Sequence, residues 1–151
     1  MVGILRILRD YIKEKTDLET VLEPQPVNLQ QPHIRITPKG WQFESLKETD
    51  NFLGMQYTVV LNCQLKLVGF GDGPDEFLVS VLNASFKLHE LFYKPFSIPL
   101  IEGNSAGSMT VKANQKIAGE FFQNKQEGVM PYSYEEEFEL NIFLPFSVLI
   151  T

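Results

Sequence analysis

The segment from Tyr57 to Leu67 alternates between apolar and polar side chains more cleanly than the rest of the chain. The inward-type positions are Tyr57, Val59, Leu61, Cys63, Leu65 and Leu67, and they alternate with Thr58, Val60, Asn62, Gln64 and Lys66. Successive side chains of a strand point to opposite faces, so this pattern predicts a strand with one buried and one wet face. A parallel sheet under helices on both sides would read as a continuous apolar run. The segment therefore predicts an antiparallel sheet with one solvated side.

Two further segments have helical periodicity. Residues 2–16 are expected to form an amphipathic helix with one apolar face, made of Val2, Ile4, Leu5, Leu8, Tyr11 and Ile12. We interpret this face as packing on the core, with a membrane surface or a partner helix as the alternative. A second helix is expected after residue 73, ending near residues 93–95, with an inward stripe of Phe77, Leu78, Val81, Leu82, Ser85, Leu88 and Phe92.

The turn before the second helix reads GFGDG, residues 69–73. A glycine-rich turn between a strand and a helix could hold a phosphate, but the spacing here is G-x-G-x-G, and no Gly-Lys-Ser or Gly-Lys-Thr follows. Asp72, Asp75 and Glu76 instead place carboxylates at the positive end of the helix dipole, where a phosphate would bind. Pro74 suits the first helical position. The motif therefore predicts a strand-to-helix turn and no nucleotide site.

The other strands are less regular. HIRIT (residues 33–37) predicts a short strand, and residues 38–54 a long loop or loose hairpin. Met109, Val111 and Ala113 predict one or two strands with a break near Asn114. A closing strand is expected after residue 131, and Pro145 suggests that its far end lies at a sheet edge or leaves the sheet. We expect one α+β domain over residues 1–151.

Composition restricts the partners. The net charge of −6 disfavours specific nucleic-acid binding, which depends on clustered Lys and Arg. No apolar run approaches the roughly 20 residues that span a bilayer, and the start of the chain does not resemble a signal peptide. The expectation is a soluble cytoplasmic protein without membrane contact.

Residues suited to catalysis are sparse. Cys63 is the only cysteine and falls on the inward side of its strand, so it is expected to be a buried small hydrophobe. His33 is expected on a strand surface, and His89 on a surface or at a helix end. Neither the histidines nor the acids match a hydrolase or metal motif. We therefore expect no enzyme activity, no cofactor and no metal.

Two groups of residues stay open as interaction candidates. Trp41, Phe43 and Phe52 lie on the irregular segment 38–54, where large aromatic residues either form a satellite core or anchor an interface. The acidic run of residues 134–139 is interpreted as a solvated strand face that discourages edge aggregation. The alternative is a negatively charged wall lining something.

The order of elements carries a resemblance. A first helix, then PHIRITPKGW, a long strand, a packed helix and the closing EFELNIFLPFSV together resemble the tail-terminator and related tail-completion proteins of long-tailed bacteriophages and prophages. The resemblance covers nearly the whole chain and rests on element order and size. It implies an α+β subunit with its helices on one side of a mainly antiparallel sheet.

The resemblance also implies a function. Such subunits form a homo-oligomeric ring, usually a hexamer, that caps the tail tube, ends elongation and prepares joining to the head. The implied partners are the tail-tube and head-completion proteins, and the implied location is the virion tail after assembly in the host cytoplasm. The implied contact residues are Trp41, Phe43, Phe52, Phe121 and Phe122. Glu135, Glu136 and Glu137 would form an acidic lumen face that lets DNA pass without sticking.

Two alternatives remain beside this assignment. A head–tail connector or baseplate component would share the ring-forming, non-enzymatic character and differ in the neighbour that it touches. A small-ligand binding module would need an apolar pocket enclosed between sheet and helix.

Overall fold

The computed structural model describes residues 3–23, 31–48, 55–102, 105–115, 119–123 and 132–145. Two helices and seven strands lie within these ranges. In chain order they are α1 (Ile4–Thr16), β1 (Glu19–Leu22), β2 (His33–Glu48), β3 (Met55–Gly71), α2 (Pro74–Leu91), β4 (Phe96–Glu102), β5 (Ser105–Gln115), β6 (Glu120–Gln123) and β7 (Tyr132–Pro145).

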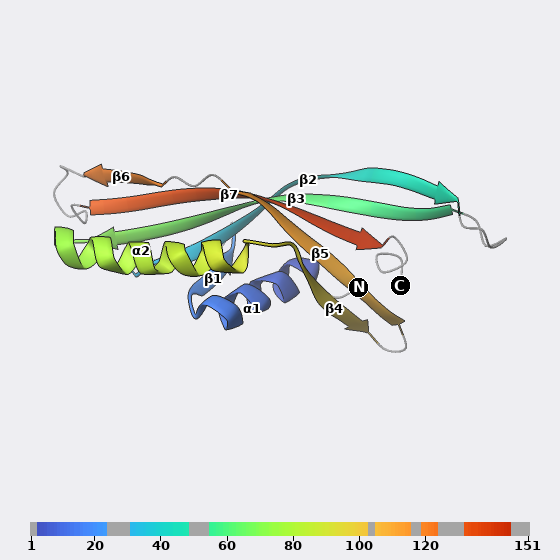
Figure 1. Ribbon diagram of the computed structural model, residues 1–151, viewed down its shortest axis with the longest axis horizontal. Coiled ribbons are helices and arrows are strands. Elements are labelled where there is room, and N and C mark those ends of the chain that lie inside the picture. Colours follow the sequence, from blue (N-terminus) through green and yellow to red (C-terminus); the bar gives the residue numbers. More distant parts are fainter. Residues whose placement is uncertain are drawn as a thin grey trace.

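The strands form one sheet in the order β1-β2-β3-β7-β5-β4, with β6 also paired to β7 (Figure 1). Every pairing is antiparallel except that of β1 with β2. β5 and β6 follow one another along the same side of β7, opposite residues 138–143 and 132–135 respectively. The α+β class is confirmed, and the sheet is mixed rather than purely antiparallel.

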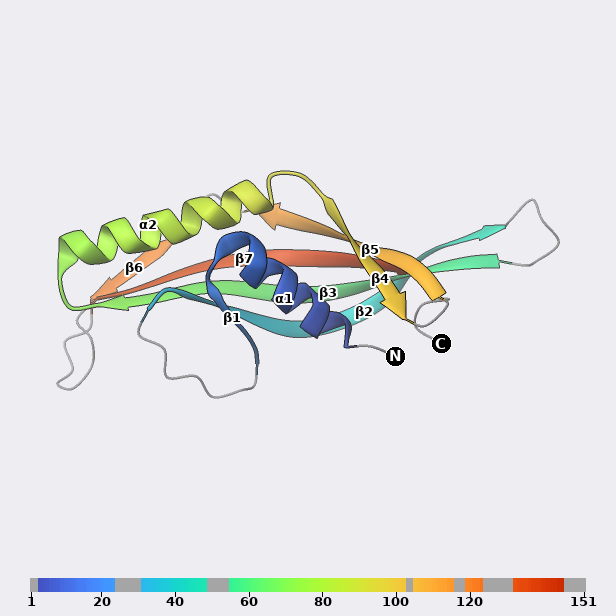
Figure 2. The same ribbon diagram turned by 90° about the horizontal axis from the view of Figure 1, so that it is seen from below.

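Both helices lie on one side of this sheet (Figure 2). α1 turns Ile4, Leu8 and Ile12 toward the sheet. It ends where Asp17 takes a left-handed conformation (φ 56°) and donates its backbone N–H to the Lys13 carbonyl at 2.9 Å. Helices commonly end this way.

The inward stripe predicted for α2 is only partly right. α2 buries Phe77, Val81 and Leu88, whereas Leu78 and Leu82 are 41% and 50% exposed. The helix has apolar side chains on more than one face, so periodicity alone does not select the face that meets the sheet.

The glycine-rich segment explains which face of α2 is inward. β3 runs through Gly71, and Gly73 is the N-cap before Pro74, as expected of a strand-to-helix turn. A Cβ atom at Gly71 would lie 2.7 Å from Phe77 Cβ, and one at Gly69 would lie 2.9 Å from Val81 Cγ2. The two glycines therefore let α2 pack closely on β3.

The loop expected after residue 37 is largely strand. β2 continues to Glu48 and pairs with β3, but its register shifts between Pro38 and Gly40 and again between Phe43 and Leu46. Such bulges interrupt the alternation of side chains between the two faces. The sequence therefore lacks the period-two pattern that would have predicted this part of the strand. β1, which the sequence did not predict, pairs only with residues 33–36 of β2.

The sheet has two regions that differ in how far the helices cover them. The arm consists of residues 38–48 of β2 and 55–63 of β3, and in Figures 1 and 2 its end reaches beyond both helices. The covered half consists of residues 65–71 of β3 and 132–138 of β7, on the side of the molecule where α2 lies. α2 contacts both of these strands.

The closing strand is central. β7 lies between β3 on one side and β5 and β6 on the other, so its acidic run does not protect a sheet edge. β7 ends at Pro145, paired with Thr58. Cys63 is 3% exposed, as predicted, and burial raises the pKa of its thiol to about 11.

Candidate functional site

The first candidate aromatic pair lies on the arm and is exposed. Trp41 is 64% and Phe43 50% exposed, and their rings meet edge to face with centroids 5.4 Å apart. An exposed large apolar patch marks an interaction surface more often than an exposed single residue does. Phe52 lies outside the described residues.

The second candidate pair lies on β6, away from the arm (Figure 1). Phe121 is 53% and Phe122 41% exposed. The Phe121 ring nevertheless contacts Tyr134, with centroids 4.9 Å apart, and Phe77 at 6.1 Å. Phe121 is therefore partly exposed and partly packed in a small aromatic cluster with Phe77 and Tyr134. The aromatic residues predicted as one contact set thus form two separate groups.

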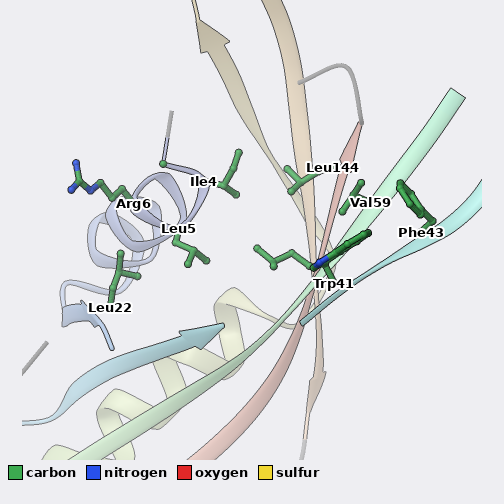
Figure 3. Close-up of a pocket in the computed structure, with 10 residues that line it drawn as sticks. Ile4, Leu5, Arg6, Leu22, Trp41, Phe43, Val59 and Leu144 are labelled. Atoms are coloured by element: carbon green, nitrogen blue, oxygen red, sulfur yellow. The ribbon is translucent and has the colours of Figure 1, made fainter. Parts of the chain in front are cut away.

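An apolar groove of about 620 Å³ lies between the start of α1 and the arm (Figure 3). Its lining is Gly3, Ile4, Leu5, Arg6, Leu22, Trp41, Phe43, Val59, Leu61 and Leu144. Among the described residues that line it, Arg6 alone has a charged side chain, and its guanidinium points away from the groove. The sequence indicated Trp41 and Phe43 but not the groove, because its walls come from five segments of the chain.

A second apolar surface lies on the outer side of α2. Leu78, Val79, Leu82 and Phe86 are 41%, 59%, 50% and 68% exposed. Their spacing places them on one face of the helix, and we call this set the ridge. Helical periodicity alone predicts Leu78 and Leu82 on the inward stripe, and their exposure contradicts this. The sequence does contain a sign of this second surface, because α2 has more apolar residues than one inward face can hold.

The predicted acidic face divides between the two sides of β7. Glu135 and Glu137 lie on the side away from the helices, where Lys66 Nζ contacts their carboxylates at 2.7 and 3.4 Å. Gln64 also donates to Glu137 at 3.1 Å. Hydrogen bonding to Glu135, followed by the charges of both acids, raises the pKa of Lys66. This face therefore carries paired charges rather than bare acids.

Glu136 does not belong to that face, so grouping it with its neighbours was wrong. It is 2% exposed and lies under α2, because adjacent residues of a strand point to opposite sides. Its carboxylate accepts hydrogen bonds from Ser85 Oγ at 2.6 Å and from Tyr134 OH at 2.9 Å. His89 Nε2 contacts the other carboxylate oxygen. Burial, followed by the hydrogen bond and charge of Glu136, raises the pKa of Tyr134 to about 12.

The order of groups in this buried network differs from that of a nucleophile triad. In a nucleophile triad the imidazole lies between the hydroxyl and the carboxylate. Here the carboxylate lies between Ser85 and His89, so neither side chain activates the other. The network joins α2 to β7. His89 lies in the last turn of α2, as one of the predicted alternatives had it, but its ring contacts Phe138 and Glu136 inside the protein.

His33 is also buried, contrary to the prediction of a surface position. It is 0% exposed; the Arg35 Nε–H donates to its Nε2 at 2.9 Å, so its Nδ1–H faces the Gln31 carbonyl, also at 2.9 Å. These bonds fit the neutral ring, and burial lowers the pKa of His33. A polar cavity of about 420 Å³ beside it is lined by residues that include Glu19, Asn83 and Lys87. Both ring nitrogens are occupied, so His33 does not present a free base to this cavity.

Within the described ranges, no three His, Cys, Asp or Glu side chains are grouped so as to hold a metal ion. Neither described helix is long and apolar enough to cross a membrane.

Comparison with known proteins adds no family. No family model matches the chain, and no curated protein sequence matches it.

Proposed function

We propose that this chain is a structural subunit that assembles head to tail into a ring and works by contact rather than by catalysis. The observation that carries the proposal is the presence of two different exposed apolar surfaces. The ridge lies on α2 and the groove between α1 and the arm. A monomer rarely leaves large contiguous apolar patches in water, so both surfaces are suited to partners.

The difference between the two surfaces favours a ring. A twofold interface uses the same patch on both subunits, whereas a contact between unlike patches joins copies head to tail. Head-to-tail contacts close into a ring when the rotation between copies is a whole fraction of a turn. The ridge is convex and the groove concave, which is the unlike pair that such an interface needs.

Within this class we propose a bacteriophage or prophage tail terminator, with a hexamer favoured. The α+β fold with both helices on one side of the sheet agrees with what the resemblance implies, and the element order supports it. The subunit would cap the tail tube, end its elongation and prepare joining to the head, in a virion tail assembled in the host cytoplasm. If the helix-free side of the sheet faces the lumen, DNA would pass Glu135, Glu137 and Lys66, a surface of paired charges.

The test is the mass of the chain by light scattering, alone and with tail tubes from the same genome. We expect a ring, or a monomer that binds tube ends and stops tube growth. Binding to portal protein instead of tubes would indicate the head–tail connector alternative. A monomer that ignores tubes at every concentration would contradict the proposal.

A substitution on the arm tests whether Trp41 anchors the association of subunits. Trp41→Ala should weaken association by about 30-fold, as the loss of a central aromatic anchor commonly does, while the free energy of unfolding of the single chain changes little. Tyr93→Ala is the control, since Tyr93 is 76% exposed and lies outside both surfaces. Equal losses of association for the two variants would show that Trp41 is not an anchor.

The groove also favours one second candidate. Its volume and apolar lining fall in the range of small-ligand pockets. A small-ligand binding module would retain an apolar molecule in native mass spectrometry, and Trp41→Ala would release it. This candidate accounts for the groove but leaves the ridge without a role.

A further inference from the structure

We propose that the ridge of one copy seats in the groove of the next copy, with Asp75 of the ridge side facing Arg6 of the groove side. This inference rests on the proposed ring function and names the surfaces that meet. It commits to a second copy of this chain as the occupant of the groove.

A convex helix face and a concave groove have complementary shapes. The ridge runs from Leu78 to Phe86, which spans about 12 Å at a rise of roughly 1.5 Å per residue. Leu5 lines the groove from α1, and Trp41 lines it from β2 (Figure 3). An apolar helix face laid in an apolar groove is a recurring recognition mode.

Charge also matches across the proposed contact. Asp75 lies three and four residues before Leu78 and Val79, so it continues the same helix face. Arg6 lines the groove, and its guanidinium points out of the apolar lining, so a partner charge would meet it at the rim. On α1, Arg9 already pairs with Asp10 at 3.0 Å and Lys13 with Glu19 at 3.1 Å. Among the residues that the structure describes, Arg6 and Asp75 have no ion-pair partner, so each is available to the other in a neighbouring copy.

A second copy explains more of the surface than the other occupants do. A small apolar ligand would fill the groove and leave the four ridge side chains in water. Ridge-to-ridge packing would cover α2 and leave the groove open. The ridge-in-groove contact covers both surfaces, and it does so in every copy of a closed ring.

Cross-linking tests the contact directly. Leu82→Cys places a thiol on the ridge and Leu5→Cys one in the groove, and the two single variants are mixed. A short bis-maleimide then joins thiols that lie close together, because each thiolate adds across a maleimide double bond, which takes up one proton, without an oxidant. Background from Cys63 should be low, since it is 3% exposed and its thiol pKa is raised to about 11.

We expect cross-linked pairs in the mixture of the two variants and at least tenfold less product from either variant alone. Asn83→Cys mixed with Leu5→Cys is the matched control, because Asn83 is the exposed neighbour of Leu82 but lines the polar cavity beside His33. This pair should cross-link poorly. The charge reversals Arg6→Asp and Asp75→Arg should each reduce association, and the two reversals in one chain should restore it.

Each contrary result overturns the inference in a recognisable way. Product from Leu82→Cys alone would show that ridges pack on each other. No product in the mixture, while light scattering shows a wild-type ring, would refute this contact and leave the proposed function standing. A wild-type chain that stays monomeric with and without tubes would remove both proposals.

Discussion

The covered half and the arm share strand β3, which pairs with β7 in the first and with β2 in the second, yet the two regions use their side chains differently. Under α2, β3 and β7 bury Leu65, Leu67 and Phe138 completely and add the enclosed carboxylate of Glu136. On the arm, β2 leaves Trp41 and Phe43 at least half exposed. The first region buries its apolar side chains under α2, whereas the second leaves large aromatic side chains exposed among the residues that the structure describes. One sheet thus encloses apolar side chains at one end and exposes aromatic side chains at the other.

The strongest test of this division is the buried carboxylate. Glu136→Ala should lower the free energy of unfolding by about 3–5 kcal/mol, because it leaves Ser85, His89 and Tyr134 without their shared acceptor. Glu137→Ala, on the wet side of the same strand, should change it by less than about 1 kcal/mol. Urea unfolding followed by circular dichroism measures both. A similar loss for the two variants would mean that the network does not stabilise the covered half.

A smaller difference in stability is expected between glycine substitutions in the two regions. Gly71→Ala should destabilise the chain by about 1–3 kcal/mol, because the new Cβ would lie 2.7 Å from Phe77 Cβ and push α2 off β3. Gly40→Ala on the arm has no atom within 4 Å of its new Cβ and should be neutral or slightly stabilising. Thermal melts of the two variants give the comparison. If both melt like wild type, close packing of α2 does not depend on Gly71.

The smallest effect concerns His33, at the junction of β1 and β2. Its pKa in the folded state is lower than the ordinary 6.5, so the unfolded chain takes up the proton first as the pH falls. The stability that the neutral ring contributes is therefore complete above pH 6.5 and is lost as the pH drops from there toward the folded-state pKa. Wild type should lose more stability between pH 7.5 and 5 than His33→Gln does. Parallel pH profiles would show that His33 takes up its proton equally in both states.

The sequence predicted those parts of the fold in which one local pattern decides the outcome. The alternation from Tyr57 to Leu67 and the carboxylates at the start of α2 were enough for a strand and a turn. The distal part of β2 was missed because two bulges break its period. The inward face of α2 was half wrong because Gly69 and Gly71, on a different element, select it.

The candidate site was predicted in part for the same reason. Trp41 and Phe43 were named from composition, but whether they were core or surface depended on a groove built from distant segments. Glu136, by contrast, could have been placed from the sequence, because the alternation of a strand puts it on the opposite face from Glu135 and Glu137. His33 could not be placed from sequence, because its burial depends on packing at the junction rather than on its neighbours in the chain.

The central position of β7 has a consequence for how the chain folds. β7 is the last described strand to leave the ribosome, yet it joins β3 to β5 and β6. Before it emerges, the β1–β2–β3 group and the β4–β5 hairpin have no strand between them. The pairing of Lys66 with Glu137 closes a long stretch of chain, and sheets that depend on such distant pairings fold slowly. A nascent subunit therefore exposes both open flanks of its future sheet until β7 has been synthesised, which makes this interval the one in which a chaperone would protect it most.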